Sequence, residues 1–259
     1  MEKVPVTVAV ITKNEEKNID ECLGSVHGWA DEIIVVDDQS SDKTVERARW
    51  YTDRVFARKM DNEGIHRNWA HAQARNSWVM ILDADEQATL ELKQEIESAL
   101  PGTPHSCFSI PLKTYIGKTW IRHSGWYPAS KIRLFKKEDF KYEEVGVHPR
   151  AILAPGKTEG HLTKDIIHKG YPDIEHFLAS VNRQTTLEAQ KWIATNRKMS
   201  FGKALWRMID RFPRRYIRKK GYKDGMYGFL IAYFDSFYQL MSYLKYLEIK
   251  RNIGLKTKD

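Results

Sequence analysis

The sequence predicts an α/β protein, in which a mainly parallel sheet is flanked by helices and followed by a helical C-terminal extension. Two observations lead to this fold class. Apolar, β-branched runs without a helical period, at residues 4–11, 33–36 and 78–82, predict buried strands. Amphipathic helices are predicted between these strands, and that alternation is typical of βαβ units and a parallel sheet.

Each element follows from its local pattern. Ile19, Cys22, Leu23 and Val26 have the i, i+3, i+4, i+7 spacing of a helix packed on a sheet. The first hundred residues predict strands at 4–11, 33–36, 54–57 and 78–82, and helices at 18–26, 43–51, 66–74 and 89–100. Strand and turn patterns mix over residues 107–134, shorter strands are expected within 143–153 and 161–168, and a long helix is expected over 174–192.

Composition and charge limit the class of protein. Hydrophobic residues make up 42% and charged residues 29% of the chain, which indicates a globular protein with a real core. The formal net charge of +8 favours anionic partners, and nine basic residues against one acid lie between Lys203 and Lys223. This shift predicts a catalytic domain over residues 1–200 and a basic, aromatic, amphipathic helical extension over 201–259. Two cysteines without metal-ligand spacing favour a reducing compartment.

Three predicted parallel strands end in polar clusters, TKNEE, DDQSSD and DADE. Ligands of open α/β sheets bind beyond the carboxyl ends of the strands, so residues 12–15, 37–38 and 83–85 should meet at one crevice. Asp83 and Asp85, one residue apart at a strand exit, can face one cavity. Hard cations such as Mg²⁺ or Mn²⁺ take oxygen ligands from one or two carboxylates and from substrate phosphates. We therefore expect a divalent metal that carries a phosphorylated ligand.

The stretches VAVITKNEEKNIDECLGSV, DEIIVVDDQSSDKT and WVMILDADE resemble the nucleotide-binding half of family 2 glycosyltransferases, which have the GT-A (Rossmann-like) fold. Further along, GWYPASKIRLFKK, VHPR, HLTKDIIHKGY and IEHFLASVNRQTTLEA are similar to the lipopolysaccharide-core glucosyltransferase branch of that family. The resemblance covers about residues 4–192 in order. It implies transfer of a hexose from a nucleotide-sugar, with a UDP-sugar as the expected donor.

The resemblance also implies roles for individual residues. Asp38, helped by Asp37, would accept a hydrogen bond from uracil, and Asp83 would contact ribose or metal. Asp85 would bind Mg²⁺ or Mn²⁺, and His168 would contact the metal or the diphosphate. The remaining residues expected on the donor side are Thr12, Asn14, Glu15 and Arg67.

The catalytic base is where the sequence departs from the family pattern. Relatives in this branch read Val-His-Glu, whereas Pro149 follows His148 here and cannot act as a base. Glu144, Glu143 or His148 takes the role, or the acceptor differs; Glu144 is slightly favoured. The loop Gly125-Trp126-Tyr127 resembles an acceptor-side loop whose aromatic faces stack on sugar.

The expected activity is therefore inverting, metal-dependent transfer to a lipopolysaccharide-core or other lipid-linked glycan. Basic residues beside an aromatic helix suit an anionic membrane, so we expect a cytoplasmic protein that is peripheral on the cytoplasmic face of the inner membrane. Two other functions remain open, a nucleotidyltransferase and a noncatalytic nucleotide-sugar binding protein. TKNEEKN lacks the Gly-rich basic loop that would favour the nucleotidyltransferase, and no nucleic-acid motif accompanies the basic patch.

Overall fold

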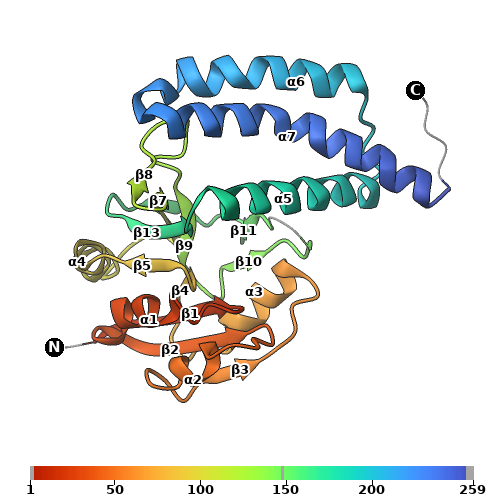
Figure 1. Cartoon of the computed structure of the whole chain (residues 1–259). Helices are drawn as coiled ribbons and strands as arrows, with labels where there is room; N and C mark the ends of the chain where they lie inside the picture. Colours follow the sequence, from red (N-terminus) through yellow and green to blue (C-terminus); the bar gives the residue numbers. More distant parts are fainter. Residues whose placement is uncertain (1–2, 147–148, 255–259) are drawn as a thin grey trace. The chain divides into compact units, whose positions relative to one another are not determined.

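The computed structural model describes residues 3–146 and 149–254 (Figure 1). They form two compact units. The first comprises the described residues up to Lys113 together with Ala129–Gly170, and the second comprises Thr114–Pro128 and the described residues from Tyr171 onward. The division differs from the predicted boundary at residue 200, because Thr114–Pro128 and α5 (Ile174–Ala194) group with the C-terminal helices.

The first unit carries the sheet. Its helices are α1 (Ile19–His27), α2 (Thr44–Ala48), α3 (Glu63–Ala72) and α4 (Leu90–Ala99). Its strands are β1 (Val4–Thr12), β2 (Ala30–Asp37), β3 (Val55–Ala57), β4 (Trp78–Asp83), β5 (Glu86–Ala88), β6 (Cys107–Ile110), β9 (Lys131–Lys136), β10 (Phe140–Tyr142), β11 (Ala151–Leu153) and β12 (Glu159–His161). Two strands, β7 (Leu112–Ile116) and β13 (Ile166–Tyr171), begin in the first unit and end in the second.

The main sheet has the strand order β12-β6-β9-β4-β1-β2-β3. Neighbouring strands are parallel except at β9, which runs antiparallel to both β4 and β6. Six of the seven strands therefore run in one direction, which confirms the predicted mainly parallel sheet. β10 and β11 form a separate antiparallel pair, and β13 pairs antiparallel with β5.

The sheet has a core on each face, because successive side chains of a strand point to opposite sides. Val6, Val8 and Val10 of β1 share one cluster with apolar residues of α1 and α4. Ala9, between them, belongs to a second cluster that includes Ala70 of α3. Helices therefore cover both faces, and this burial explains why the central strands read as nearly continuous apolar runs.

The second unit is mainly helical. Besides α5 it contains the short strand β8 (Thr119–Trp120), α6 (Phe201–Pro213), a π-helical turn at Arg214–Arg218, a 3₁₀ turn at Gly221–Asp224 and the long α7 (Gly225–Asn252). α7 packs along both α5 and α6 (Figure 1). Trp192 of α5, Ala204 of α6 and Tyr243 of α7 form a buried cluster. The C-terminal helical extension is thus confirmed.

Replacing Gly64, in the first turn of α3, tests the close contact between this helix and the backbone at Glu143. A Cβ atom at this position would lie 1.9 Å from the carbonyl oxygen of Glu143, so Gly64→Ala forces the two segments apart. We expect it to lower the free energy of unfolding by about 1–3 kcal/mol in urea denaturation. Gly24→Ala, in the middle of α1, is the control, because the nearest atoms lie 3.9 Å away. Gly24→Ala should raise the free energy of unfolding by about 0.5–1 kcal/mol. Equal changes in the two variants would contradict the close contact at Gly64.

Candidate active site at the carboxyl ends of the strands

The three polar clusters meet because the central strands end side by side. Thr12 at the end of β1 is paired in register with Asp37 of β2. Ile11 of β1 is paired with Asp83 of β4, and the backbone N–H of Asp38 donates to the carbonyl of Thr12 at 2.9 Å. Residues that are far apart in the sequence therefore share one edge of the sheet, as the βαβ pattern predicted.

Asp83 lies between two arginines that come from different elements. Its Oδ1 accepts a hydrogen bond from Nη2 of Arg67 in α3, and its Oδ2 accepts one from Nη2 of Arg133 in β9, both at 2.9 Å. Arg133 also pairs with the buried carboxylate of Glu86, whose Oε2 accepts from the backbone N–H of Asp83 at 3.0 Å. The acidic cluster after β4 is thus neutralised by protein cations.

The two guanidinium groups have the largest net effect on the pKa of Asp83. Burial by itself would raise the pKa of this carboxyl, but the charges of Arg67 and Arg133 outweigh burial and hold the pKa well below its usual range. A lowered pKa adds stability above the pKa of the unfolded chain, about 4. That stability is lost as the pH falls from there toward the folded-state pKa.

Asp85 faces a different partner. Nε2 of His168 in β13 lies 3.2 Å from its Oδ2, and both side chains are only about a quarter exposed. The antiparallel pairing of β13 with β5 produces this contact, because it sets His168 opposite Glu86. Burial lowers the pKa of His168, but the hydrogen bond and charge of Asp85 and the charge of Glu86 raise it overall.

The predicted nucleotide side is a network of loops after β1 and β2. Asp38 forms an ion pair with Lys13 at 2.8 Å, and its other oxygen accepts from the backbone N–H of Met60. Asp37 accepts both hydrogen bonds that Ser40 donates. Asn14, in the left-handed region at φ 54°, accepts from the backbone N–H of Ser41 at 2.8 Å.

Glu15 connects this network to the acidic cluster. Its pKa is raised, mainly by burial and in part by the negative charges of Asp85, Asp42 and Asp83. Its neighbourhood therefore includes carboxylates that follow both β2 and β4. The predicted donor-side residues all belong to the first unit, where Arg67 of α3 reaches Asp83 and the others lie at or just after the ends of β1, β2 and β4.

Several buried polar atoms at this edge have no hydrogen-bond partner among the described residues. They include Oγ1 of Thr12, Nη1 of Arg67 and Nε of Arg133. Buried donors are normally satisfied, because an unpaired one costs about 1–3 kcal/mol. Arg67 and Arg133 both bind Asp83, and Thr12 ends the neighbouring strand, so these unpaired atoms lie at the edge where a polar or anionic ligand is expected.

The donor set for a metal is incomplete in the protein. Within residues 3–146 and 149–254, no group of three or more His, Cys, Asp or Glu side chains is arranged to hold an ion. Both oxygens of Asp83 are engaged by arginines, whereas Asp85 and His168 face each other. Mg²⁺ commonly takes one or two carboxylates and completes its shell with phosphates and water. The residues present therefore fit a metal whose remaining ligands arrive with the substrate.

The candidate bases lie on the segment after β10. Glu143 is half-buried and its Oε2 lies 3.6 Å from Nε of Arg150, while Glu144 is exposed. The backbone of this segment is held against α3, since the N–H of Gly64 donates to the carbonyl of Val145 at 3.1 Å. His148, the third candidate, lies outside the described residues.

Three site residues escaped the sequence reasoning: Lys13, Glu86 and Arg133. Arg133 had a signal, because a charged residue inside the apolar strand KIRLFK alternates onto a buried face and needs a buried partner. Glu86 stands in the acidic cluster but received no role. Nothing in the local pattern distinguishes Lys13 from a solvated lysine.

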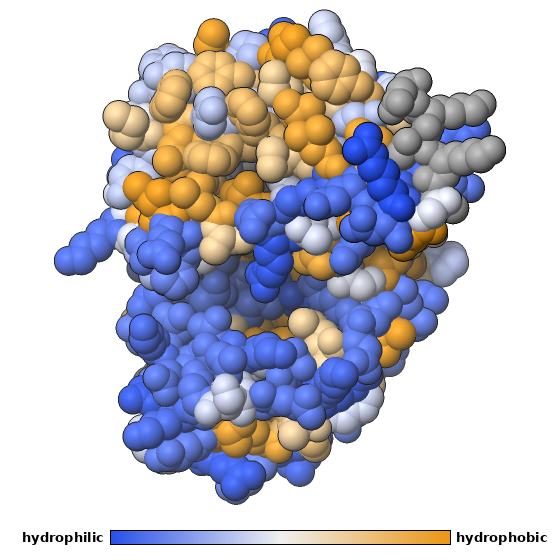
Figure 2. Space-filling view, turned by 45° about the vertical axis from the view of Figure 1, so that its right-hand side comes forward, coloured by the Kyte–Doolittle hydropathy of each residue, from blue (hydrophilic) through white to orange (hydrophobic). Residues whose placement is uncertain are grey.

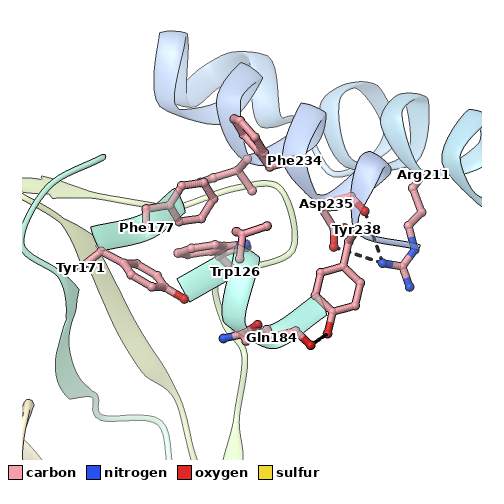
Figure 3. A pocket seen from close by; sticks show the side chains of 10 residues that line it. Trp126, Tyr171, Phe177, Gln184, Arg211, Phe234, Asp235 and Tyr238 are labelled. Carbon is pink, nitrogen blue, oxygen red and sulfur yellow. Dashed lines mark hydrogen bonds and ion pairs between the residues drawn. The ribbon is translucent and has the colours of Figure 1, made fainter. Parts of the chain in front are cut away.

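The second unit contains a cavity of about 260 Å³ (Figure 3). Aromatic and aliphatic side chains form most of its wall, with Gln184 and the ion pair of Arg211 and Asp235 at 3.2 Å among them. Tyr238 donates to the carbonyl of Gln184 at 3.1 Å, and burial raises its pKa to about 12. The lining residues are Trp126, Tyr171, Phe177, Val181, Gln184, Arg211, Ile231, Phe234, Asp235 and Tyr238. Trp126 comes from the predicted acceptor-side loop.

The mainly parallel sheet with arginine-paired carboxylates at its strand ends defines an α/β protein, and comparison with known proteins gives the family. The profile described as "Glycosyl transferase family 2" matches residues 7–152, so the chain belongs to glycosyl transferase family 2. An uncharacterized glycosyltransferase of Rickettsia typhi is 25% identical over 266 residues, covering 98% of this chain and 89% of the relative. The predicted family and its GT-A α/β fold class are confirmed.

Two further similarities were found. The "Lipopolysaccharide core biosynthesis glycosyltransferase LpsC" of Rhizobium meliloti is 21% identical over 249 residues, covering 94% of this chain and 92% of that protein. The crystal structure of S. aureus TarS 1–349 aligns over the whole chain and 93% of its own length, with 16% identity and a TM-score of 0.45.

Arg133→Gln tests the charge network. It leaves Asp83 with one arginine and Glu86 without its cation, so we expect the free energy of unfolding at neutral pH to fall by roughly 3–5 kcal/mol. The variant should also lose less stability on acidification than the wild type, because less of the depressed pKa of Asp83 remains. Urea denaturation across a pH series measures both effects. Lys141→Gln, at an exposed position of β10, should change stability by no more than about 0.5 kcal/mol. A similarly small change in Arg133→Gln would contradict the network.

Proposed function

We propose that this family 2 glycosyltransferase transfers a hexose from a UDP-sugar, with inversion, to a lipopolysaccharide-core or other lipid-linked glycan. The observation that carries the donor side is the convergence of Thr12, Asp37 and Asp83 on one sheet edge, together with the unpaired buried donors there. The acceptor class is supported by the likeness to LpsC over most of both chains.

On the donor side, Asp38 receives the uracil ring. Both of its oxygens already accept one hydrogen bond, from Lys13 and from the Met60 amide. Each carboxylate oxygen has a second lone pair, so Asp38 can also accept from the N3–H of uracil. The wall around the nucleoside is formed by Asp37, Thr12, Asn14 and Glu15. Arg67 adds positive charge beside Asp83.

Asp85 and His168 would hold Mg²⁺ or Mn²⁺, and Asp83 would add its charge without giving up its arginines. The ion, when bound, neutralises negative charge that develops on the leaving diphosphate. The residues of the chain prepare this step: the arginine-balanced Asp83 lets a pyrophosphate approach a cluster that would otherwise repel it. Preorganised charge of this kind often supplies most of an enzyme's rate enhancement.

The chemical step is a single displacement at the anomeric carbon. Glu144 takes the proton of the acceptor hydroxyl, the acceptor oxygen bonds to the anomeric carbon, and the bond from that carbon to the diphosphate oxygen breaks. Attack from the opposite face inverts the configuration. Glu143 is the second candidate for the base, and its ion pair with Arg150 makes it the less available of the two glutamates.

A lipid-linked acceptor places the enzyme at a membrane surface, on the cytoplasmic face of the inner membrane. Over the part of the chain that the structure describes, no helix has the length and apolar character needed to cross a bilayer. Contact with the membrane is therefore proposed to be peripheral. A noncatalytic nucleotide-sugar binding protein is the alternative that Pro149 leaves open, and acceptor-dependent release of UDP separates the two.

Asp85→Asn tests the metal. With UDP-glucose and related UDP-sugars as donors, we expect kcat/KM to fall by about 100-fold or more, and Mn²⁺ to lose its effect on UDP affinity in calorimetry. EDTA should abolish wild-type transfer, and added Mn²⁺ or Mg²⁺ should restore it. Asp53→Asn, an exposed carboxylate of the same unit, is the matched control. Full activity of Asp85→Asn, or of the wild type in EDTA, would remove the metal from the mechanism.

Glu144→Gln and Glu143→Gln identify the base. Loss of a general base lowers kcat by about 10²–10⁴-fold, while the affinity for UDP should stay unchanged because neither side chain is placed on the nucleotide. We expect Glu144→Gln to show this loss and Glu143→Gln to retain most activity. Wild-type kcat in both variants would exclude both glutamates and leave His148 as the remaining candidate.

A further inference from the structure

Helix α6 carries two arginines on the side that contacts α7 and large apolar residues on its exposed side. Arg207 and Arg211 point inward, where Arg207 donates to Gln239 of α7 at 2.7 Å and Arg211 pairs with Asp235 of α7. Trp206 and Ile209 point outward and are 69% and 56% exposed. A helix that packs on a protein core in water normally buries its apolar face and exposes its charges. Helix α6 buries Ala204 in this way but leaves Trp206 and Ile209 exposed.

The exposed apolar residues continue beyond α6. Ile217 in the π-helical turn is 61% exposed, and along α7 the residues Met226, Phe229 and Tyr233 are exposed at the i, i+3, i+7 spacing of one helix face. Ring contacts join the two stripes, since Phe212 of α6 lies 5.8 Å from Phe229. Figure 2 shows apolar residues gathered over α6 and α7. We call this surface the outer helical face, comprising Trp206, Ile209, Ile217, Met226, Phe229 and Tyr233.

Basic side chains border the outer helical face. Arg218, Lys219, Lys220 and Lys223 are exposed in the turns between α6 and α7. Among the described residues, none of these four has a carboxylate within 4.0 Å, whereas Arg214 is paired with Asp210 and Arg215 with Asp235. The border is therefore positive and uncompensated.

We propose that the outer helical face inserts into the headgroup region of an anionic lipid bilayer, with the basic border on the lipid phosphates. Large apolar and aromatic side chains flanked by Lys and Arg are the features of interfacial helices. A second copy of the chain is the other occupant to consider, but a symmetric contact would bring two positive borders together. An anionic bilayer complements both the apolar area and the charge.

The proposal deepens the proposed function, whose lipid-linked acceptor lies in such a bilayer, yet its test needs neither donor nor metal. The full-length protein is sedimented with vesicles of phosphatidylcholine and phosphatidylglycerol, and with vesicles of phosphatidylcholine alone. We expect binding to the anionic vesicles that weakens with salt, and much weaker binding to the neutral ones. If the protein did not bind anionic vesicles but still transferred sugar to a soluble acceptor, the membrane proposal would be wrong and the proposed transfer reaction would be unaffected.

Two pairs of variants separate the apolar and ionic contributions. Trp206→Ser with Ile209→Ser should lower the affinity for anionic vesicles by about tenfold or more. Trp50→Ser is its matched control, because Trp50 is 66% exposed on the first unit. Arg218→Gln with Lys223→Gln should reduce both affinity and salt dependence. Lys17→Gln with Arg49→Gln removes the same charge from exposed sites of the first unit and should have little effect.

Each alternative has a distinct result. Absence of wild-type binding to anionic vesicles, or equal losses in test and control variants, would overturn the proposal. So would concentration-dependent dimerisation in sedimentation velocity that Trp206→Ser with Ile209→Ser abolishes, because a second copy would then cover the face. Circular dichroism melts of every variant establish that the helices remain folded; these outer side chains are exposed, so their replacement should leave Tm nearly unchanged.

Discussion

The site depends on how the repulsion among three carboxylates, from the end of β4 to the start of β5, is balanced. Asp83, Asp85 and Glu86 lie within four residues, and like charges a few ångströms apart repel by several kcal/mol where water is scarce. Two arginines offset this repulsion. Arg67 and Arg133 both form ion pairs with Asp83, and Arg133 also forms one with Glu86. Because one arginine comes from a helix and the other from an antiparallel strand, the cluster is tolerated only when both elements are packed. Folding and preparation of the site are therefore one event.

The same network gives the acidic residues different partners. Asp83 binds an arginine with each of its oxygens, while Asp85 faces His168. Under the proposed function, a pyrophosphate would meet carboxylates that are paired with arginines, rather than a bare acidic patch. Arg133 and His168 come from strands with antiparallel partners, β9 in the main sheet and β13 beside β5, so the site also depends on strands outside the βαβ pattern.

The second unit uses its charges in the opposite way. Arginines of α6 turn inward to pair with Asp235 and Gln239, which frees the outer side of the helix for Trp206 and Ile209. An exposed apolar surface lowers the solubility of a monomer and is usually retained for a partner. Under the proposed function that partner is the lipid surface that carries the acceptor, and both units then serve one substrate.

The sequence by itself determined the α/β class, the helices between strands, the family, and the meeting of residues 12–15, 37–38 and 83–85. The family follows from the resemblance of whole stretches to known glycosyltransferases. The other features follow from periodicity and from the rule that parallel strands end at one edge, which are local or generic properties. Only the tertiary structure decided that protein cations balance the acidic cluster, that Thr114–Pro128 groups with the C-terminal helices, and that Trp206 and Ile209 of α6 are exposed. Those features depend on pairs such as Arg133 with Asp83, 50 residues apart. Which charges become partners is set by packing and register across the chain, and no window of neighbouring residues contains that information.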